Sequence, residues 1–189
     1  DSLAEIVEKF LNETGLSKAH LIGHSLGGSI SLYLGLSHPN RVSSITLIST
    51  ASLGSEINVE YVEGFINSSR RNELRPHLQK LFSDPSLVNR QLVDDVLKFK
   101  RLDGVDKALR MIADAFISKG IQTVLLRDRL TEISVPILAI WGAEDQIIPA
   151  SQSKGLPTSV NTEIIHGQGH MVQMEAASEV NRLIERFLV

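Results

Sequence analysis

The stretch AHLIGHSLGGSISLYLGLS, residues 19–37, combines a short apolar run, a glycine-rich turn and a run of small and apolar residues. A short apolar run bounded by turn signals is typical of a buried strand, and the second run ends before Pro39 as a helix does. The turn, GHSLGG at residues 23–28, matches the pattern GxSxG. Between a strand and a helix, this pattern holds the serine on a strained turn with its hydroxyl exposed. The stretch therefore predicts strand, turn and helix, with Ser25 as a candidate nucleophile.

The remaining elements alternate between helical and strand patterns along the chain. Apolar residues recur at helical spacing near the N-terminus and again from Val172 to Leu188, and the strand candidates are continuous aliphatic runs without alternation. The sequence predicts helices at residues 2–14 and 29–37 and strands at residues 19–23, 42–49, 136–142 and 162–166. Continuous runs of this kind suit a mostly parallel sheet with helices on both faces, which is an α/β fold.

Residues 51–133 are far longer than a connection between two parallel strands requires. They contain helical patterns, among them residues 88–101 and 105–118. We interpret residues 51–133 as a helical insertion that roofs the site and sets substrate choice, on a core made of residues 1–50 and 134–189. The alternative is an extra helical layer without a role at the site.

The bulk composition narrows the class of protein. The 189 residues are 42% hydrophobic and 22% charged, as in ordinary globular domains, and the formal net charge is −3. This charge gives no basic surface for nucleic acid or anionic lipid, and no apolar run is long enough to span a membrane. The sequence has no cysteine, which excludes disulfides and thiolate chemistry and is compatible with a cytoplasmic protein.

A serine hydroxyl needs a base to take its proton, and the base needs a group that orients it. The segment WGAEDQIIP at residues 141–149 follows a predicted strand and places Asp145 in the loop beyond it, with Glu144 as its competitor. His170 follows the next strand in the same way, so both would reach the sheet edge that presents Ser25. The alternatives are a loop-capping carboxylate, a core histidine and a glycine-rich turn without chemistry.

Other residues near these motifs have secondary predicted roles. The amide of Leu26, at the start of a helix, is a candidate oxyanion-hole donor, and His24 and Met171 are candidates for lining the substrate site. His166 and His170 have the spacing of a metal pair, but two glycines between them oppose a helix and no acidic residue lies there. We therefore predict no metal site and no bound cofactor.

Taken as a set, the segments GHSLGG, WGAEDQIIP and GHMVQME resemble those of the α/β-hydrolase superfamily. Residues 56–65, 81–88 and 98–105 resemble the hydrolase-like catalytic domain of the acetyltransferase component of acetoin dehydrogenase systems. The resemblance implies transfer of an acetyl group from a lipoyl arm to coenzyme A, with both groups as substrates. It also implies that the protein works with the other components of an acetoin dehydrogenase complex in the cytoplasm. The sequence departs from that pattern because it has neither a lipoyl domain nor the HxxxDG motif.

The leading hypothesis is serine acyl transfer on a small-molecule acyl substrate, with a thiol or water as acceptor. The alternative from another class is a scaffold or receptor that keeps the fold without chemistry. The chain begins at Asp1 inside a helical pattern, so we expect the N-terminal part of the fold, and a second oxyanion donor, to be missing from it. Its first strand would then be an unpaired edge, which predicts self-association and weak catalysis.

Overall fold

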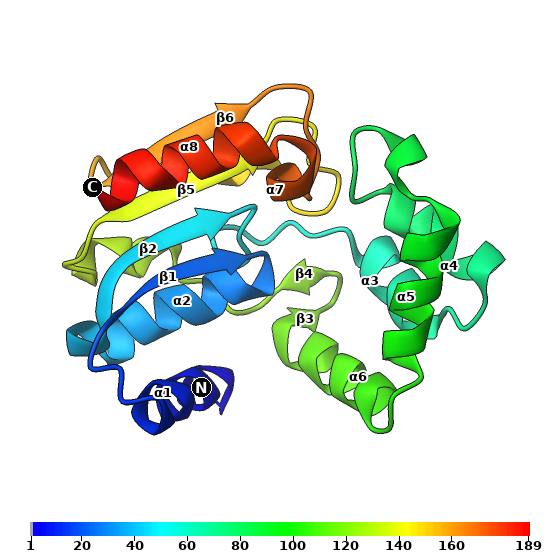
Figure 1. Ribbon diagram of the computed structural model, residues 1–189, viewed down its shortest axis with the longest axis horizontal. Helices are drawn as coiled ribbons and strands as arrows, with labels where there is room; N and C mark the ends of the chain where they lie inside the picture. The colour runs from blue at the N-terminus through cyan, green and yellow to red at the C-terminus, as the bar shows by residue number, and fades with distance from the viewer. Residues whose placement is uncertain (1) are drawn as a thin grey trace.

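The computed structural model describes residues 2–189, and its centre is a four-stranded sheet in the order β1-β2-β5-β6 (Figure 1). The strands are β1 (Ala19–His24), β2 (Val42–Ile48), β5 (Ile137–Gly142) and β6 (Val160–Ile165). All three neighbouring pairs are parallel. The carboxyl ends of the four strands therefore lie at one edge of the sheet, where open α/β sheets place their ligands.

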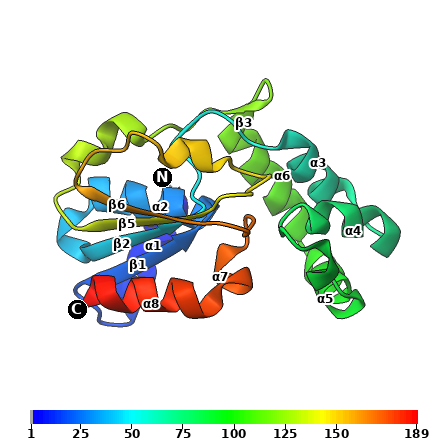
Figure 2. The same ribbon diagram turned by 90° about the horizontal axis from the view of Figure 1, so that it is seen from above.

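Helices cover the two faces of this sheet. Alternate residues of β5 point to opposite sides: Leu138 and Ile140 pack in one apolar cluster, Ala139 and Trp141 in the other. The helices are α1 (Ser2–Glu13) and α2 (Leu26–Ser37) on the side of Trp141, and α7 (Val172–Glu175) and α8 (Ala177–Leu188) on the side of Ile140 (Figure 2). β5 is buried along its whole length, which accounts for its unbroken apolar sequence.

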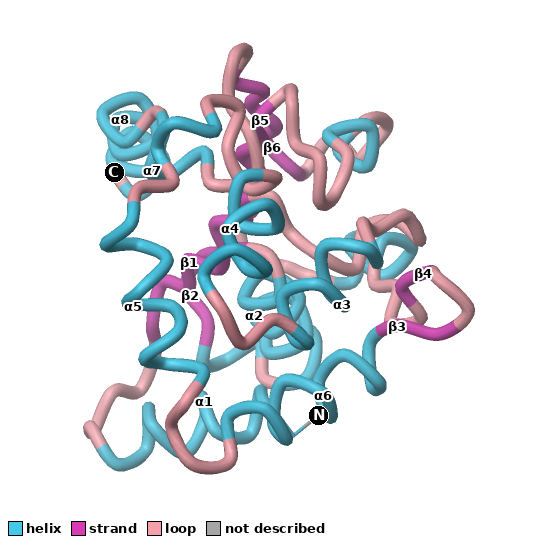
Figure 3. Tube along the Cα trace, turned by 90° about the vertical axis from the view of Figure 1, so that its right-hand side faces the viewer, coloured by secondary structure: helices cyan, strands magenta, loops and turns pink. Residues whose placement is uncertain are grey.

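The segment between β2 and β5 is mostly helical. It contains α3 (Val59–Asn67), α4 (Arg71–Gln79), α5 (Arg90–Lys100), α6 (Val105–Phe116) and a short hairpin of β3 (Ile117–Ser118) and β4 (Ile121–Gln122). α4 and α5 pack on a small apolar core of their own that includes Leu74 and Leu97. Figures 1 and 3 place the four helices beyond the carboxyl ends of the strands. No helix formed by residues 2–189 is long and apolar enough to cross a membrane.

The ends of this segment belong to the main core. Ala51 and Leu53 after β2, and Leu126 and Leu130 before β5, are buried in the same cluster as the sheet. The part that leaves the core is therefore shorter than residues 51–133, and from here on "the helical insertion" means residues 56–122.

The mostly parallel α/β sheet predicted from the sequence is confirmed, with differences at element ends. α2 begins at Leu26 rather than at residue 29, because the helix starts directly after the strained serine. α6 ends at Phe116 because the chain turns there into the β3–β4 hairpin. β1 is an edge strand, paired only with β2 among the described residues.

Candidate active site

Ser25 occupies the sharp turn between β1 and α2. Its φ of 53° and ψ of −117° are unusual for a residue other than glycine, and such strain persists only where neighbouring bonds impose it. Here the Ser25 N–H donates to Ile48 O (2.9 Å) and the Ser25 carbonyl accepts from Ala51 N (3.0 Å). These bonds fix the turn to the end of β2.

Glycines on either side make this turn possible. A Cβ on Gly23 would lie 2.3 Å from Gly27 O, and one on Gly28 would lie 2.0 Å from Thr50 Oγ1. β1, α2 and the loop after β2 can approach this closely only without side chains at these positions. Packing around Ser25 therefore requires glycine at positions 23 and 28, whereas a Cβ on Gly27 would meet no atom within 4 Å.

Asp145 and His170 lie in the loops after β5 and β6, and their side chains are joined by a buried hydrogen bond. His170 Nδ1 is 2.8 Å from Asp145 Oδ2, and the two residues are 2% and 8% exposed. The other carboxylate oxygen, Oδ1, accepts from Ile147 N (2.8 Å) and Ile148 N (2.9 Å). An ionised carboxylate can only accept, so Nδ1 carries the proton and Nε2 of the neutral ring is left as the basic nitrogen.

The structure shows which of the two neighbouring carboxylates, Glu144 or Asp145, contacts His170. The Glu144 side chain is exposed, and its backbone N–H donates to Gln168 O (2.9 Å). Asp145, one residue later, is buried against His170. The carboxylate that contacts the histidine is therefore that of Asp145. Between residues 2 and 189, the Ser25 hydroxyl forms no hydrogen bond with His170, a contact that often tightens only when substrate binds.

His24 contacts the backbone and the ring of His170. Its Nε2 lies 3.0 Å from the His170 carbonyl oxygen, and the two rings are 4.7 Å apart. Burial, reinforced by the neighbouring His170, lowers the pKa of His24 from 6.5 to about 4. His24 is therefore neutral at neutral pH, and its Nε2–H can donate to that carbonyl.

A second set of bonds ties the His170 loop to the helical insertion. Glu175 accepts from Gly169 N (2.6 Å) through Oε2 and from Ser83 N (2.7 Å) through Oε1. Met171 N donates to Leu81 O (3.0 Å). Residues 81–83 of the insertion thus hold the loop on both sides of His170. The sequence motif contained Glu175, but nothing in its spacing indicated this contact.

An apolar cavity of about 170 Å³ opens beside Ser25 and Leu26. Its walls come mainly from α3 and α6, through residues such as Tyr61, Phe65 and Phe116. His24 and Met171 are not among the residues that line it: His24 contacts His170, and Met171 packs with the apolar cluster of α4 and α5.

Tyr61 gives this cavity a polar group. Burial raises the pKa of Tyr61 to about 12, so the hydroxyl stays protonated and remains a donor. Among residues 2–189 the hydroxyl forms no hydrogen bond, and it is not one of the fully buried side-chain atoms that lack a partner. The residue was missed from sequence because its spacing with Phe65 is that of an ordinary helix core. No group of three or more His, Asp or Glu among residues 2–189 is arranged to hold a metal ion.

The strained serine, the buried Asp–His pair and the cavity all lie at the carboxyl end of a parallel sheet in an α/β fold. In agreement with this, the family model described as the alpha/beta hydrolase fold matches residues 1–177, and the chain belongs to that family.

Individual relatives divide into two kinds. The chain is 45% identical over 188 residues to the dihydrolipoyllysine-residue acetyltransferase component of the acetoin cleaving system of Pseudomonas putida, covering 100% of this chain and 50% of that protein. It is 28% identical to a 2-hydroxy-6-oxononadienedioate/2-hydroxy-6-oxononatrienedioate hydrolase of Burkholderia vietnamiensis, covering 100% and 68%. The chain thus spans about half the length of the acetyltransferase component.

The fold is also that of solved hydrolases. A meta-cleavage product hydrolase from Pseudomonas fluorescens superposes with a TM-score of 0.87 at 21% identity, over 100% of this chain and 71% of that one. At this identity the likeness concerns the fold alone. The family and the relatives named above are enzymes, which agrees with the enzyme class predicted from the sequence.

Proposed function

We propose that the protein catalyses serine-dependent acyl transfer, with Ser25 as nucleophile, His170 as base and Asp145 as the group that orients the histidine. The observation that carries the proposal is the buried Asp145–His170 hydrogen bond at the same sheet edge as a serine held at φ 53°. A structural Asp–His pair does not require a strained serine turn beside it, and a strained turn does not require the pair.

Each residue has a defined task in the reaction. The Ser25 oxygen attacks the carbonyl carbon of a thioester or ester while His170 Nε2 takes the hydroxyl proton. The N–H of Leu26, the first residue of α2, donates to the oxyanion, since the first amides of a helix have no partner within it. The leaving thiol or alcohol then takes the proton from His170, and the acyl group remains on Ser25.

The second half-reaction reverses these steps with an acceptor. The acceptor gives its proton to His170 and attacks the acyl-enzyme, and Ser25 regains its proton as the product leaves. We infer that the acyl group is acetyl, that its donor is a lipoyl thioester and that its acceptor is coenzyme A, within an acetoin-cleaving complex. The support is the name of the relative at 45% identity and the small apolar cavity beside Ser25.

Water is the second candidate acceptor, which would make the protein a hydrolase. The relative at 28% identity that is named as a hydrolase favours this alternative. The chemistry of Ser25, His170 and Asp145 is the same in both cases, and only the fate of the acyl-enzyme differs.

Mass spectrometry of the protein after reaction with p-nitrophenyl acetate tests the proposal. We expect one acetyl group per chain on Ser25, none in Ser25→Ala, and normal acetylation in Ser178→Ala, which removes an exposed serine from α8. Coenzyme A should speed loss of the acetyl group and yield acetyl-coenzyme A, whereas a hydrolase would release acetate at the same rate without it. Equal acetylation of the wild type and Ser25→Ala would refute the proposed nucleophile, and absence of any adduct would support a scaffold.

A further inference from the structure

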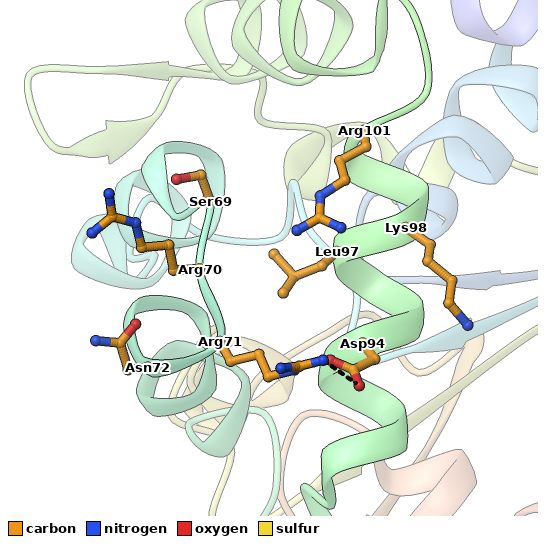
Figure 4. A pocket seen from close by; sticks show the side chains of 8 residues that line it. All are labelled: Ser69, Arg70, Arg71, Asn72, Asp94, Leu97, Lys98 and Arg101. Carbon is orange, nitrogen blue, oxygen red and sulfur yellow. Dashed lines mark hydrogen bonds and ion pairs between the residues drawn. The ribbon is translucent and has the colours of Figure 1, made fainter.

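Basic side chains gather on one surface of the helical insertion. A cavity of about 500 Å³ lies between the start of α4 and the second half of α5 (Figure 4). Four basic residues line it: Arg70, Arg71, Lys98 and Arg101. A second cavity of about 320 Å³ shares Arg71 and adds Arg75 and Arg90. We call these six residues the basic cluster.

The acidic residues nearby neutralise only part of this charge. Arg71 is bonded to Asp94 through both its Nε and its Nη2, and Lys98 Nζ lies 2.9 Å from Asp95 Oδ1. Arg70 lies 3.9 Å from Glu73 and Arg90 lies 3.8 Å from Asp94, whereas Arg75 and Arg101 form no ion pair with any residue from 2 to 189. In Figure 4 the Arg101 guanidinium extends over Leu97 into the gap that faces Arg71.

The sign of this surface is opposite to that of the chain as a whole, whose formal net charge is −3. A locally positive, concave surface on a negatively charged protein concentrates anions at that place and not elsewhere. Planar guanidinium groups match the oxygens of phosphate with paired hydrogen bonds. The cluster is therefore suited to a small ligand that carries phosphate groups.

We propose that the basic cluster binds the phosphate groups of coenzyme A, the acceptor thiol. The proposal rests on the acyl transfer proposed for Ser25, which needs a thiol acceptor. The floor of the larger cavity is Leu97, which belongs to the same apolar cluster as Phe65, and Phe65 lines the cavity of Ser25. The two cavities are thus joined through one apolar cluster of the helical insertion, and an acceptor held by its phosphates would have to extend past this cluster for its thiol to reach the acyl-enzyme.

Calorimetric titration with coenzyme A and with pantetheine, which has the same thiol arm but neither the phosphates nor the adenosine, tests the proposal, and competition by pyrophosphate isolates the part of the affinity due to phosphate. We expect coenzyme A to bind at least about tenfold more tightly than pantetheine, since charge-assisted hydrogen bonds are lost with the phosphates. Inorganic pyrophosphate should compete with coenzyme A, and added salt should weaken binding. Equal affinity for the two thiols would overturn the proposal.

A matched pair of charge reversals locates the site. Arg101→Glu should weaken coenzyme A binding at least about tenfold, whereas Arg182→Glu on α8 changes the net charge equally and should leave binding within about twofold. Arg75→Glu replaces Arg101→Glu if that variant melts early. Equal effects of Arg101→Glu and Arg182→Glu would overturn the assignment.

These measurements are independent of the chemistry at Ser25. If coenzyme A binds through Arg101 but Ser25 is never acetylated, the basic cluster stands and the proposed acyl transfer fails. If Ser25 is acetylated and passes the acetyl group equally well to pantetheine and coenzyme A, acyl transfer stands and the phosphate site fails.

Discussion

Replacing Asp145 with asparagine should impose the wrong tautomer on His170. Asp145 Oδ1 accepts two backbone N–H groups, from Ile147 (2.8 Å) and Ile148 (2.9 Å). An amide at this position keeps those bonds only if its oxygen takes the place of Oδ1. The NH2 group then occupies the place of Oδ2, 2.8 Å from His170 Nδ1. Nδ1 must accept from it, so the ring proton moves to Nε2, the nitrogen that would otherwise take the proton of Ser25.

The size of the effect follows from this geometry. A base protonated on the wrong nitrogen cannot accept the serine proton, and the loss in a triad is about 10^4 in turnover, or about 5 kcal/mol of transition-state stabilisation. The backbone bonds of Ile147 and Ile148 survive in this variant, so the loop and the melting temperature should change little.

The assay is the rate of Ser25 acetylation by p-nitrophenyl acetate in a stopped-flow instrument, with Glu144→Gln as control. Glu144→Gln removes the same charge from the neighbouring residue, whose side chain is exposed, and this variant should be acetylated at nearly the wild-type rate. An Asp145→Asn rate within about tenfold of the wild type, or a larger loss in Glu144→Gln, would refute the assigned tautomer.

Three further predictions concern residues around the site. Glu175→Gln places an NH2 group against the N–H of Gly169 or Ser83, so turnover should fall about tenfold at nearly constant KM. The free energy of unfolding should fall by about 1–3 kcal/mol. The control is Glu179→Gln, and equal kinetics of the two variants would exclude a positioning role for Glu175. Tyr61→Phe removes a hydroxyl without a protein partner, so the melting temperature measured by calorimetry should stay the same or rise. The KM for acyl donors should change. A lower melting temperature would show that the hydroxyl makes a stabilising hydrogen bond. The pKa of His24 is about 4 in the fold and 6.5 ordinarily, so between these pH values the unfolded chain binds more protons than the folded one. The free energy of unfolding should therefore fall as the pH drops from about 6.5 towards 4. In urea unfolding, the free energy of His24→Asn should depend less steeply on pH than that of the wild type, and an equal dependence would contradict the shift.

The parts of the site that sequence could predict are those built by local segments. Ser25, Asp145 and His170 each follow a strand directly, and parallel strands end at one edge, so their convergence follows from chain order. The choice between Glu144 and Asp145 could not be made in this way. It depends on which carboxylate the loop after β5 turns inward, and that loop is fixed by the bond from Trp141 Nε1 to Ile148 O (2.9 Å).

The parts that sequence could not predict are contacts between distant segments. Tyr61 and Phe116 meet beside Ser25 because α3 and α6 pack over the strand ends, and their spacing within each helix resembles that of any amphipathic helix. The bond between Glu175 and Ser83 joins residues 92 positions apart. Roles for His24 and Met171 at the substrate site stay predictions.

The bonds of residues 81–83 change what the helical insertion is expected to do. Treated as a roof alone, it could be replaced by a linker with loss of acyl selectivity only. Yet Leu81 O and Ser83 N hold Met171 and Glu175, and a Cβ on Gly169 would lie 2.8 Å from Ser83 N, so the His170 loop is packed against the insertion. Deleting the insertion would free this loop and lower the acylation rate for small esters as well. Selectivity and rate can be separated only by changes such as Tyr61→Phe, which alter the cavity and leave the bonds of Ser83 in place.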